Sequence, residues 1–171
     1  MVSKKIITET VAIPAGVTAQ VRGFTVSASG PKGKNERSLP LRGVKITLKG
    51  ANIEVNGPLR EVGTVRSHIF NMLNGSKDGY TQKMKVIYAH FPIAIEVKGK
   101  DMVVKNFVGE KQPRKVKIIG DTKVEAKVPT VTVSGPCKED VFQTVANIRQ
   151  ATKIKNRDSR IFQDGIYPVD E

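Results

Sequence analysis

Basic side chains are the residues of this sequence with the clearest chemistry, because Lys and Arg bind the phosphates of nucleic acids. The chain of 171 residues holds 29 Lys and Arg against 16 Asp and Glu, a net charge of +13. The segments 105–117 and 149–160 each hold five basic residues and one acidic residue. Charge added for solubility alone would be interspersed, whereas clustering indicates a binding face for a polyanion. Nucleic acid is the commonest polyanion, so the sequence predicts a nucleic-acid-binding protein.

Residues that could act as catalysts or metal ligands are few. His68 and His90 lie far apart in the sequence, and Cys137 is the only cysteine. One cysteine forms no internal disulfide, and with two distant histidines it is too small a set for a convincing zinc site. Ser67 precedes His68, but adjacent side chains on a helix do not face each other, so a nucleophile and base pair is not expected. We therefore expect no enzyme activity, no cofactor and no metal.

The composition favours a soluble globular protein. Hydrophobic residues make up 39% of the chain, there is no Trp, and no apolar run approaches the roughly 20 residues that span a bilayer. The N-terminus has basic residues but lacks the long apolar segment of a signal peptide. We expect a cytoplasmic protein with no membrane partner and no small-molecule substrate.

The tetrapeptide 30–33, Gly-Pro-Lys-Gly, permits three interpretations. It could be the G-x-x-G loop of a KH domain, a phosphate cradle, or a hairpin turn. A KH loop joins two helices, whereas this segment follows the strand-like pattern of Val26 and Ala28, and a P-loop needs a longer spacing before Gly-Lys-Ser/Thr. The pattern favours a hairpin turn, with phosphate contacts from Lys32, Lys34 and Arg37 as a secondary role.

The segments 52–58 and 130–136 repeat one pattern, an alternating apolar strand that ends in Gly-Pro. Alternation places Ile53 and Val55 on one buried face, and proline suits the first turn of a helix. The repeats are 78 residues apart, about half the chain, which indicates a duplicated domain rather than a solenoid. We predict an α+β fold of two tandem copies, each a small antiparallel sheet packed on one helix, with domains 1–79 and 80–171.

Each Gly-Pro should open a helix with a buried stripe. After Pro58 the apolar residues follow the 3.6-residue period up to Gly75, a natural C-terminal stop, and they are Val62, Val65, Ile69, Met72 and Leu73. After Pro136 the expected stripe is Val141, Val145 and Ile148, widened by Phe142.

The last twenty residues lose the apolar period and become basic. We interpret them as a tail that lies on the surface and that no core requires. Phe162 and Tyr167 either pin this tail to the sheet or contact RNA. In the same way, Gly109-Glu110-Lys111 is either a turn with an ion pair or an RNA contact.

The segment 150–167, QATKIKNRDSRIFQDGIY, resembles the C-terminal signature of the universal large-subunit ribosomal protein six family, protein nine of eukaryotic cytosolic ribosomes. Supporting matches are Ser67-His68-Ile69, the segments 88–92 (YAHFP) and 106–111 (NFVGEK), and the two Gly-Pro motifs, so the resemblance covers essentially the whole chain. The tail lacks the bacterial Tyr-Lys-Gly-Lys-Gly element, so the chain resembles the archaeal and eukaryotic branch.

The resemblance implies a structural constituent of the large ribosomal subunit, in the cytoplasm, that binds rRNA near the sarcin-ricin loop and the translation-factor site. Its partners would be large-subunit rRNA and neighbouring ribosomal proteins, with translation factors nearby. The implied RNA-binding residues lie in the C-terminal domain: Lys105, Lys111, Arg114, Lys115, Lys153, Lys155, Arg157, Arg160, Gln163 and Tyr167. The alternative from the charge alone is a free-standing basic RNA-binding regulator or chaperone. An RNA-processing enzyme would need paired carboxylates, a metal cluster or an activated nucleophile, which the sequence does not offer.

Overall fold

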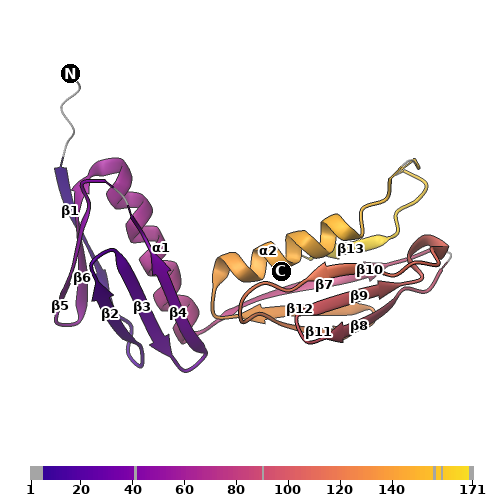
Figure 1. The fold of residues 1–171 in the computed structure, drawn as a ribbon, viewed down its shortest axis with the longest axis horizontal. Helices are drawn as coiled ribbons and strands as arrows, with labels where there is room; N and C mark the ends of the chain where they lie inside the picture. Colours follow the sequence, from indigo (N-terminus) through magenta and orange to yellow (C-terminus); the bar gives the residue numbers. More distant parts are fainter. Residues whose placement is uncertain (1–5, 41, 90, 156, 159, 170–171) are drawn as a thin grey trace, which may run out of the picture. The chain divides into compact units, whose positions relative to one another are not determined.

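The computed structural model describes residues 6–40, 42–89, 91–155, 157–158 and 160–169. Its residue contacts divide the chain into two compact units (Figure 1). Unit 1 comprises Met1–Gly79 with Pro136–Lys138, and unit 2 comprises Tyr80–Gly135 with Glu139–Glu171.

Unit 1 consists of two antiparallel sheets and one helix, α1 (Leu59–Lys77). One sheet has the strand order β1-β6-β5, formed by β1 (Ile6–Ala12), β6 (Asn52–Pro58) and β5 (Lys45–Lys49). The other has the order β2-β3-β4, formed by β2 (Thr18–Arg22), β3 (Thr25–Gly30) and β4 (Gly33–Ser38). Helix α1 contacts β1 and β6 of the first sheet and β3 and β4 of the second.

The tetrapeptide 30–33 forms the β3–β4 hairpin turn, in which Gly30 lies opposite Gly33. This confirms the predicted hairpin. A glycine is needed at position 30, because a Cβ there would lie only 2.4 Å from the Ser76 carbonyl oxygen at the end of α1.

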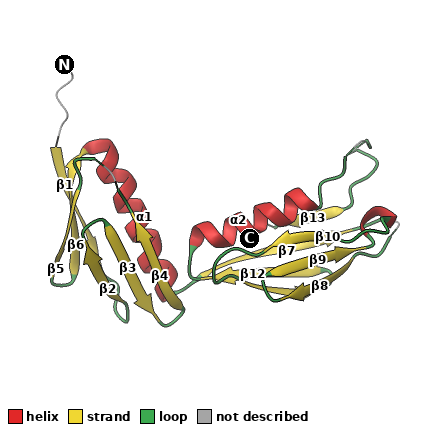
Figure 2. Ribbon diagram, viewed as in Figure 1, coloured by secondary structure: helices red, strands yellow, loops and turns green. Residues whose placement is uncertain are grey.

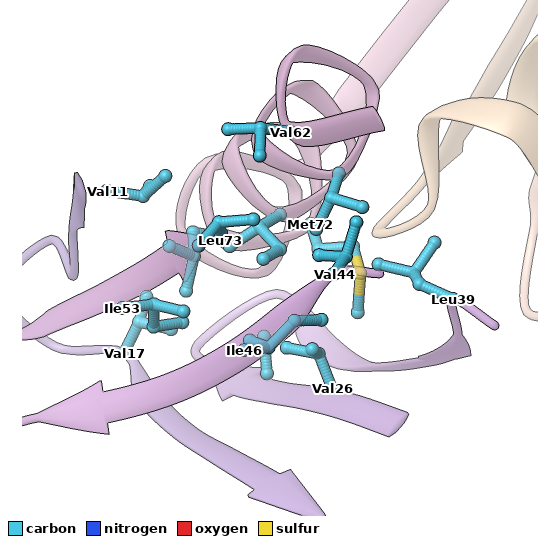
Figure 3. Packing of buried hydrophobic residues seen from close by; sticks show 14 residues of the cluster. Val11, Val17, Val26, Leu39, Val44, Ile46, Ile53, Val62, Met72 and Leu73 are labelled. Carbon is cyan, nitrogen blue, oxygen red and sulfur yellow. The ribbon is translucent and has the colours of Figure 1, made fainter. Parts of the chain in front are cut away.

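The core of unit 1 lies between α1 and the two sheets (Figure 3). The predicted faces are confirmed: Ile53 and Val55 of β6 are fully buried, and so are Val62, Val65 and Ile69 of α1. Apolar residues of β3, β5 and the loops complete this cluster, among them Val17, Val26, Leu39, Val44 and Ile46.

Both ends of α1 differ from the prediction by a few residues. Pro58 does not lie in the first turn but is the last residue of β6, with extended φ and ψ, and the helix begins at Leu59. Gly75 does not stop the helix either, because its carbonyl accepts the N–H of Gly79 and the helical ladder continues to Lys77. The glycine in the left-handed region is Gly79, with φ of +76°. It supplies the turn that Gly75 was expected to supply.

Unit 2 repeats the strand order of unit 1 with one added strand (Figure 2). The order β7-β12-β11 corresponds to β1-β6-β5, with β7 (Tyr80–Ile87), β12 (Thr130–Gly135) and β11 (Lys123–Lys127). The order β8-β9-β10 corresponds to β2-β3-β4, with β8 (Ala94–Lys98), β9 (Asp101–Lys105) and β10 (Arg114–Lys117). A one-turn helix, η1 (Phe107–Gly109), follows β9, and α2 (Lys138–Ala151) follows β12. The predicted α+β fold is therefore correct, although the strands of each unit divide into two sheets rather than one.

The added element is β13 (Gly165–Pro168), which pairs with β7 and forms an edge of the four-stranded sheet. Its Ile166 is 1% exposed and belongs to the core of unit 2, together with Val141, Val145 and Ile148 of α2. The prediction that no core requires the last twenty residues is therefore wrong. Four residues are too few to display an alternating pattern, so the sequence contained no clear strand signal here.

Two apolar residues that alternation and helical period place on buried faces are exposed: Leu48, which alternates with the buried Ile46, and Phe142, which the stripe after Pro136 includes. Leu48 of β5 is 44% exposed and Phe142 of α2 is 43% exposed. Leu48 lies one residue from the end of β5, and Phe142 is turned by about 100° from the buried Val141. The pattern of apolar residues locates a buried face but not its width.

Replacement of Ile166 by Ala should lower the free energy of unfolding by about 2–4 kcal/mol, because it removes a buried side chain and leaves a cavity in the core of unit 2. Ile161, five residues earlier, is 70% exposed and provides a matched control. The change Ile161→Ala should cost less than about 0.5 kcal/mol. Urea unfolding followed by circular dichroism measures both values, and equal losses would contradict the assignment of β13 to the core.

Candidate nucleic-acid interface

The residues predicted to bind RNA come from two segments of unit 2. Lys105, Lys111, Arg114 and Lys115 lie between the end of β9 and β10, and the others lie in or just after the basic tail, which we define as residues 152–164 between α2 and β13. Figure 1 shows the tail and the turn with η1 at the same end of unit 2. Two hydrogen bonds from Arg114 to the carbonyl oxygens of Ala151 and Lys153 join the two segments directly.

Arg114 has its guanidinium enclosed by protein groups. Its Nε and Nη2 donate to the two carboxylate oxygens of Glu110, and Nη1 donates to the carbonyl of Ala151 at 2.7 Å and of Lys153 at 3.2 Å. The guanidinium carbon lies 4.3 Å from the centre of the buried Phe107 ring. The carbonyls at the end of a helix lack helical partners, so Arg114 caps α2 and holds the start of the tail.

The pairing also changes the titration of Glu110. The hydrogen bonds from Arg114 are the main cause of a lowered pKa of Glu110, and the positive charges of Arg114 and Arg157 add to the effect. Because its pKa is lowered, the Glu110 carboxylate stays ionised beside the positive charges that surround it. The segment 109–111 thus includes an ion pair at Glu110, while contact of Lys111 with RNA stays a prediction.

The other two arginines have partners within the tail itself. Arg157 lies over the Phe162 ring, 4.8 Å from its centre. Arg160 binds the Asp158 carboxylate through Nε and Nη2, and its side chain is 88% exposed. The hydrogen bonds from Arg160 lower the pKa of Asp158. The Arg157–Phe162 contact and the Arg160–Asp158 ion pair both shape the tail locally. Most of the Arg160 side chain nevertheless stays in solvent.

Lysines of this region differ from the arginines. Lys105 binds Glu96, and its hydrogen bond is the main cause of a lowered pKa of Glu96. Among the described residues, no ion pair involves the other four lysines, all of which are exposed: Lys111, Lys115, Lys153 and Lys155. These four positive charges are available for an external anion.

Gln163 and Tyr167 complete the predicted set. Gln163 is exposed, and its side-chain amide donates to the carbonyl of Arg160 at 3.4 Å. Tyr167 is 37% exposed on β13, with its ring against Gly165, where a Cβ would lie 2.8 Å from a ring carbon. Gly165 therefore provides the space for this ring.

Three buried residues hold the tail in place, and no pattern in the sequence indicated them. The Thr152 hydroxyl donates to the carbonyl of Ile148 at 2.9 Å and accepts the N–H of Ile166 at 3.3 Å, so it joins α2 to β13. The Asp164 carboxylate accepts the N–H of Ala89 at 3.1 Å, and Ile166 lies in the core. A threonine or aspartate in a polar segment gives no signal of burial, because its partners are distant in sequence.

One residue considered for catalysis, His68, has an arginine as its neighbour. Arg37 lies 3.3 Å from the Nδ1 atom of His68 in unit 1, and His90 lies outside the described residues. Within the described part of the chain, no three His, Cys, Asp or Glu side chains lie close enough together to hold a metal ion. No helix in that part is long and apolar enough to cross a membrane.

Comparison with known proteins gives consistent matches. A family profile described as ribosomal protein L6 matches residues 91–165. The chain is 45% identical to large ribosomal subunit protein uL6 of Methanosarcina mazei, over 96% of this chain and 97% of the relative. It is 47% identical to the protein of the same name from Methanosphaera stadtmanae, over 100% and 97% of the two chains, and 46% identical to that from Archaeoglobus fulgidus, over 86% and 79%.

Replacement of Arg114 by Gln should lower the free energy of unfolding by about 1–3 kcal/mol, because it removes charged hydrogen bonds to Glu110 and to the end of α2. The contribution from Glu110 depends on pH. Its folded pKa lies below the ordinary 4.5, so this contribution is present above pH 4.5 and is lost as the pH falls through the folded pKa.

The difference in stability between wild type and variant should therefore be constant near neutral pH and shrink below pH 4.5. Lys115→Gln is the control, because it removes a neighbouring charge that has no ion pair with a described residue. Urea unfolding across this pH range measures the difference. A difference that does not change with pH would show that the ion pair with Glu110 contributes nothing.

Proposed function

We propose, on the premise that this chain belongs to the ribosomal protein L6 family in its archaeal branch, that unit 2 binds rRNA near the sarcin-ricin loop and the translation-factor site. Membership of the family makes the chain a structural constituent of the large ribosomal subunit. Its partners are the rRNA and the proteins of that subunit. Nothing in the described residues favours a free-standing RNA regulator, and we propose no enzymatic role.

A single observation supports the RNA-binding role most directly. Lys111, Lys115, Lys153 and Lys155 are exposed at one end of unit 2 and make no ion pair with a described acid. When such positive charges neutralise phosphates, counterions bound to the RNA are released. This release is the main electrostatic source of affinity for RNA. The pinned tail keeps Lys153 and Lys155 in place before the RNA arrives, which reduces the entropy lost on binding.

The residues of the interface are proposed to act in two ways. Lysines and the exposed Arg160 contact phosphates, and Gln163 and Tyr167 add hydrogen bonds or stacking to riboses and bases. Arg114 and Arg157 position the tail through protein contacts. Lys105 is shared with Glu96, so its share of the binding energy should be smaller. The C-terminal domain, residues 80–171, then provides these contacts, within the cytoplasmic ribosome and close to bound translation factors.

Replacement of Lys111, Lys115, Lys153 and Lys155 by Gln should make the plot of log affinity against log salt shallower by roughly 3–4 units, at about 0.7–0.9 per phosphate. The measurement is a salt titration of binding to a large-subunit rRNA fragment that contains the sarcin-ricin region. The control replaces Lys98, Lys100, Lys123 and Lys127, four exposed lysines of the same unit outside this interface. Equal changes in slope would show that the overall positive field, rather than this interface, binds the RNA.

The position on the rRNA needs a separate measurement. Hydroxyl-radical footprinting of the protein on deproteinised archaeal large-subunit rRNA should show protected riboses in and beside the sarcin-ricin stem, because phosphate and ribose contacts shield the backbone. The quadruple Lys→Gln variant should reduce this protection, and the control variant should retain it. Protection confined to other regions would contradict the proposed location while leaving the charge argument intact.

A further inference from the structure

A hollow of about 420 Å³ lies between the end of α2, the basic tail and β13. Its apolar walls come from three elements: Ala146 of α2, Ile154 and Phe162 of the tail, and Ile166 of β13. The polar residues that line it are mostly cationic or hydrogen-bonding, and include Arg149, Gln150, Lys153 and Tyr167. Among the residues that the structure describes, no acidic side chain lines it.

The backbone behind this hollow is largely satisfied. β13 is an edge strand, and its N–H at Ile166 donates to the hydroxyl of Thr152. Thr152 in turn donates to the carbonyl of Ile148, so its own hydroxyl has partners on both sides. The polar groups at the base of the hollow therefore already have hydrogen-bond partners. An occupant would meet mainly apolar surface and aromatic rings.

Size, shape and charge restrict the occupant. The volume lies within the roughly 300–1,000 Å³ typical of pockets for small molecules. Phe162 and Tyr167 offer ring surfaces to a planar group, and aromatic side chains stack on nucleobases of any sequence. Arg149 and Lys153 are exposed and make no ion pair with a described residue, so they can accept phosphates. A nucleotide matches both features of the hollow, because it combines a planar ring with a phosphate beside it.

We infer that this hollow binds one unpaired nucleobase of the rRNA, with the flanking phosphates on Arg149 and Lys153. The inference rests on the proposed function, because it identifies what unit 2 recognises in the RNA. Phosphate contacts position a protein on RNA without reading it, whereas a base removed from its stack can be held in a pocket and read by its edges. Gln150 and Tyr167 line the hollow, and their side chains carry an amide and a hydroxyl that can hydrogen-bond such an edge.

The direct test uses mononucleotides and does not require the rRNA. Adenosine 5′-monophosphate and uridine 5′-monophosphate, titrated into the full chain, should shift the amide NMR signals of Ala146 and Ile166, two lining residues away from Lys153, with millimolar affinity. Ribose 5-phosphate, which lacks the base, should shift only signals near Arg149 and Lys153. Equal shifts from all three compounds would show a phosphate site without a base pocket and would overturn the inference.

Two variants connect the hollow to this binding. Ala146→Phe places a ring in the hollow without changing the charge, and Ala146 is exposed, so the fold should tolerate it. It should abolish the base-dependent shifts. Tyr167→Leu keeps an apolar side chain but removes the ring, and should weaken them. Ala12→Phe, at an exposed alanine of β1 in unit 1, is the matched control and should leave the shifts unchanged.

The same variants separate this inference from the proposed function. With the sarcin-ricin fragment, Ala146→Phe should weaken binding by about 5- to 150-fold, the range expected for one stacked base, while the slope against salt stays the same. Unchanged affinity in Ala146→Phe, with a steep wild-type slope, would overturn the base pocket and leave the phosphate interface standing. A wild-type protein that fails to bind the fragment would overturn the proposed function and the inference with it.

Discussion

The candidate interface depends on a buried hydroxyl that bridges the end of α2 and β13. Thr152 donates to Ile148 in the last turn of the helix and accepts the N–H of Ile166 in β13. Between Thr152 and Gly165 the described residues include several like charges and no helix or strand, so repulsion and conformational entropy both oppose a fixed arrangement. A basic segment of this kind keeps one conformation only where buried groups anchor both of its ends. Thr152 anchors the first end of the tail, and Asp164 and Ile166 anchor the second.

The arginines and lysines of this region have different roles, and the chemistry of the side chains explains why. A guanidinium has several donors in a rigid plane, so Arg114 can bind a carboxylate, cap two carbonyls and stack on Phe107 at once. Arg157 and Arg160 likewise use ring and carboxylate partners within the tail. An ammonium group on a flexible stem is strongly hydrated and gains little from such partners, and four of the lysines remain in solvent. The arginines therefore shape the surface, and the lysines provide most of its available charge.

The duplication accounts for what the two units share, and β13 for what they do not. Both units arrange six strands in the same two orders and follow the sixth strand with a helix. Only unit 2 extends beyond that helix, and the extension returns to pair with β7 at an edge that would otherwise expose unpaired backbone groups. The added strand places its side chains beside the end of α2. The hollow beside the end of α2 exists because that strand and the tail enclose a space. The described part of unit 1 has no corresponding elements to enclose one.

The sequence by itself determined the features that depend on local pattern. Alternation and helical period located the buried faces of β6, α1 and α2, and the clusters of Lys and Arg indicated the candidate interface, because side-chain spacing and charge are visible without a fold. The tertiary structure alone decided which of those cations have protein partners, since Glu96 reaches Lys105 across a hairpin and Arg114 reaches Ala151 across 37 residues. It also decided that Gly79 rather than Gly75 ends the helical turn, and that Ile166 is buried. These outcomes depend on contacts between residues far apart in the chain, and no local pattern encodes such contacts.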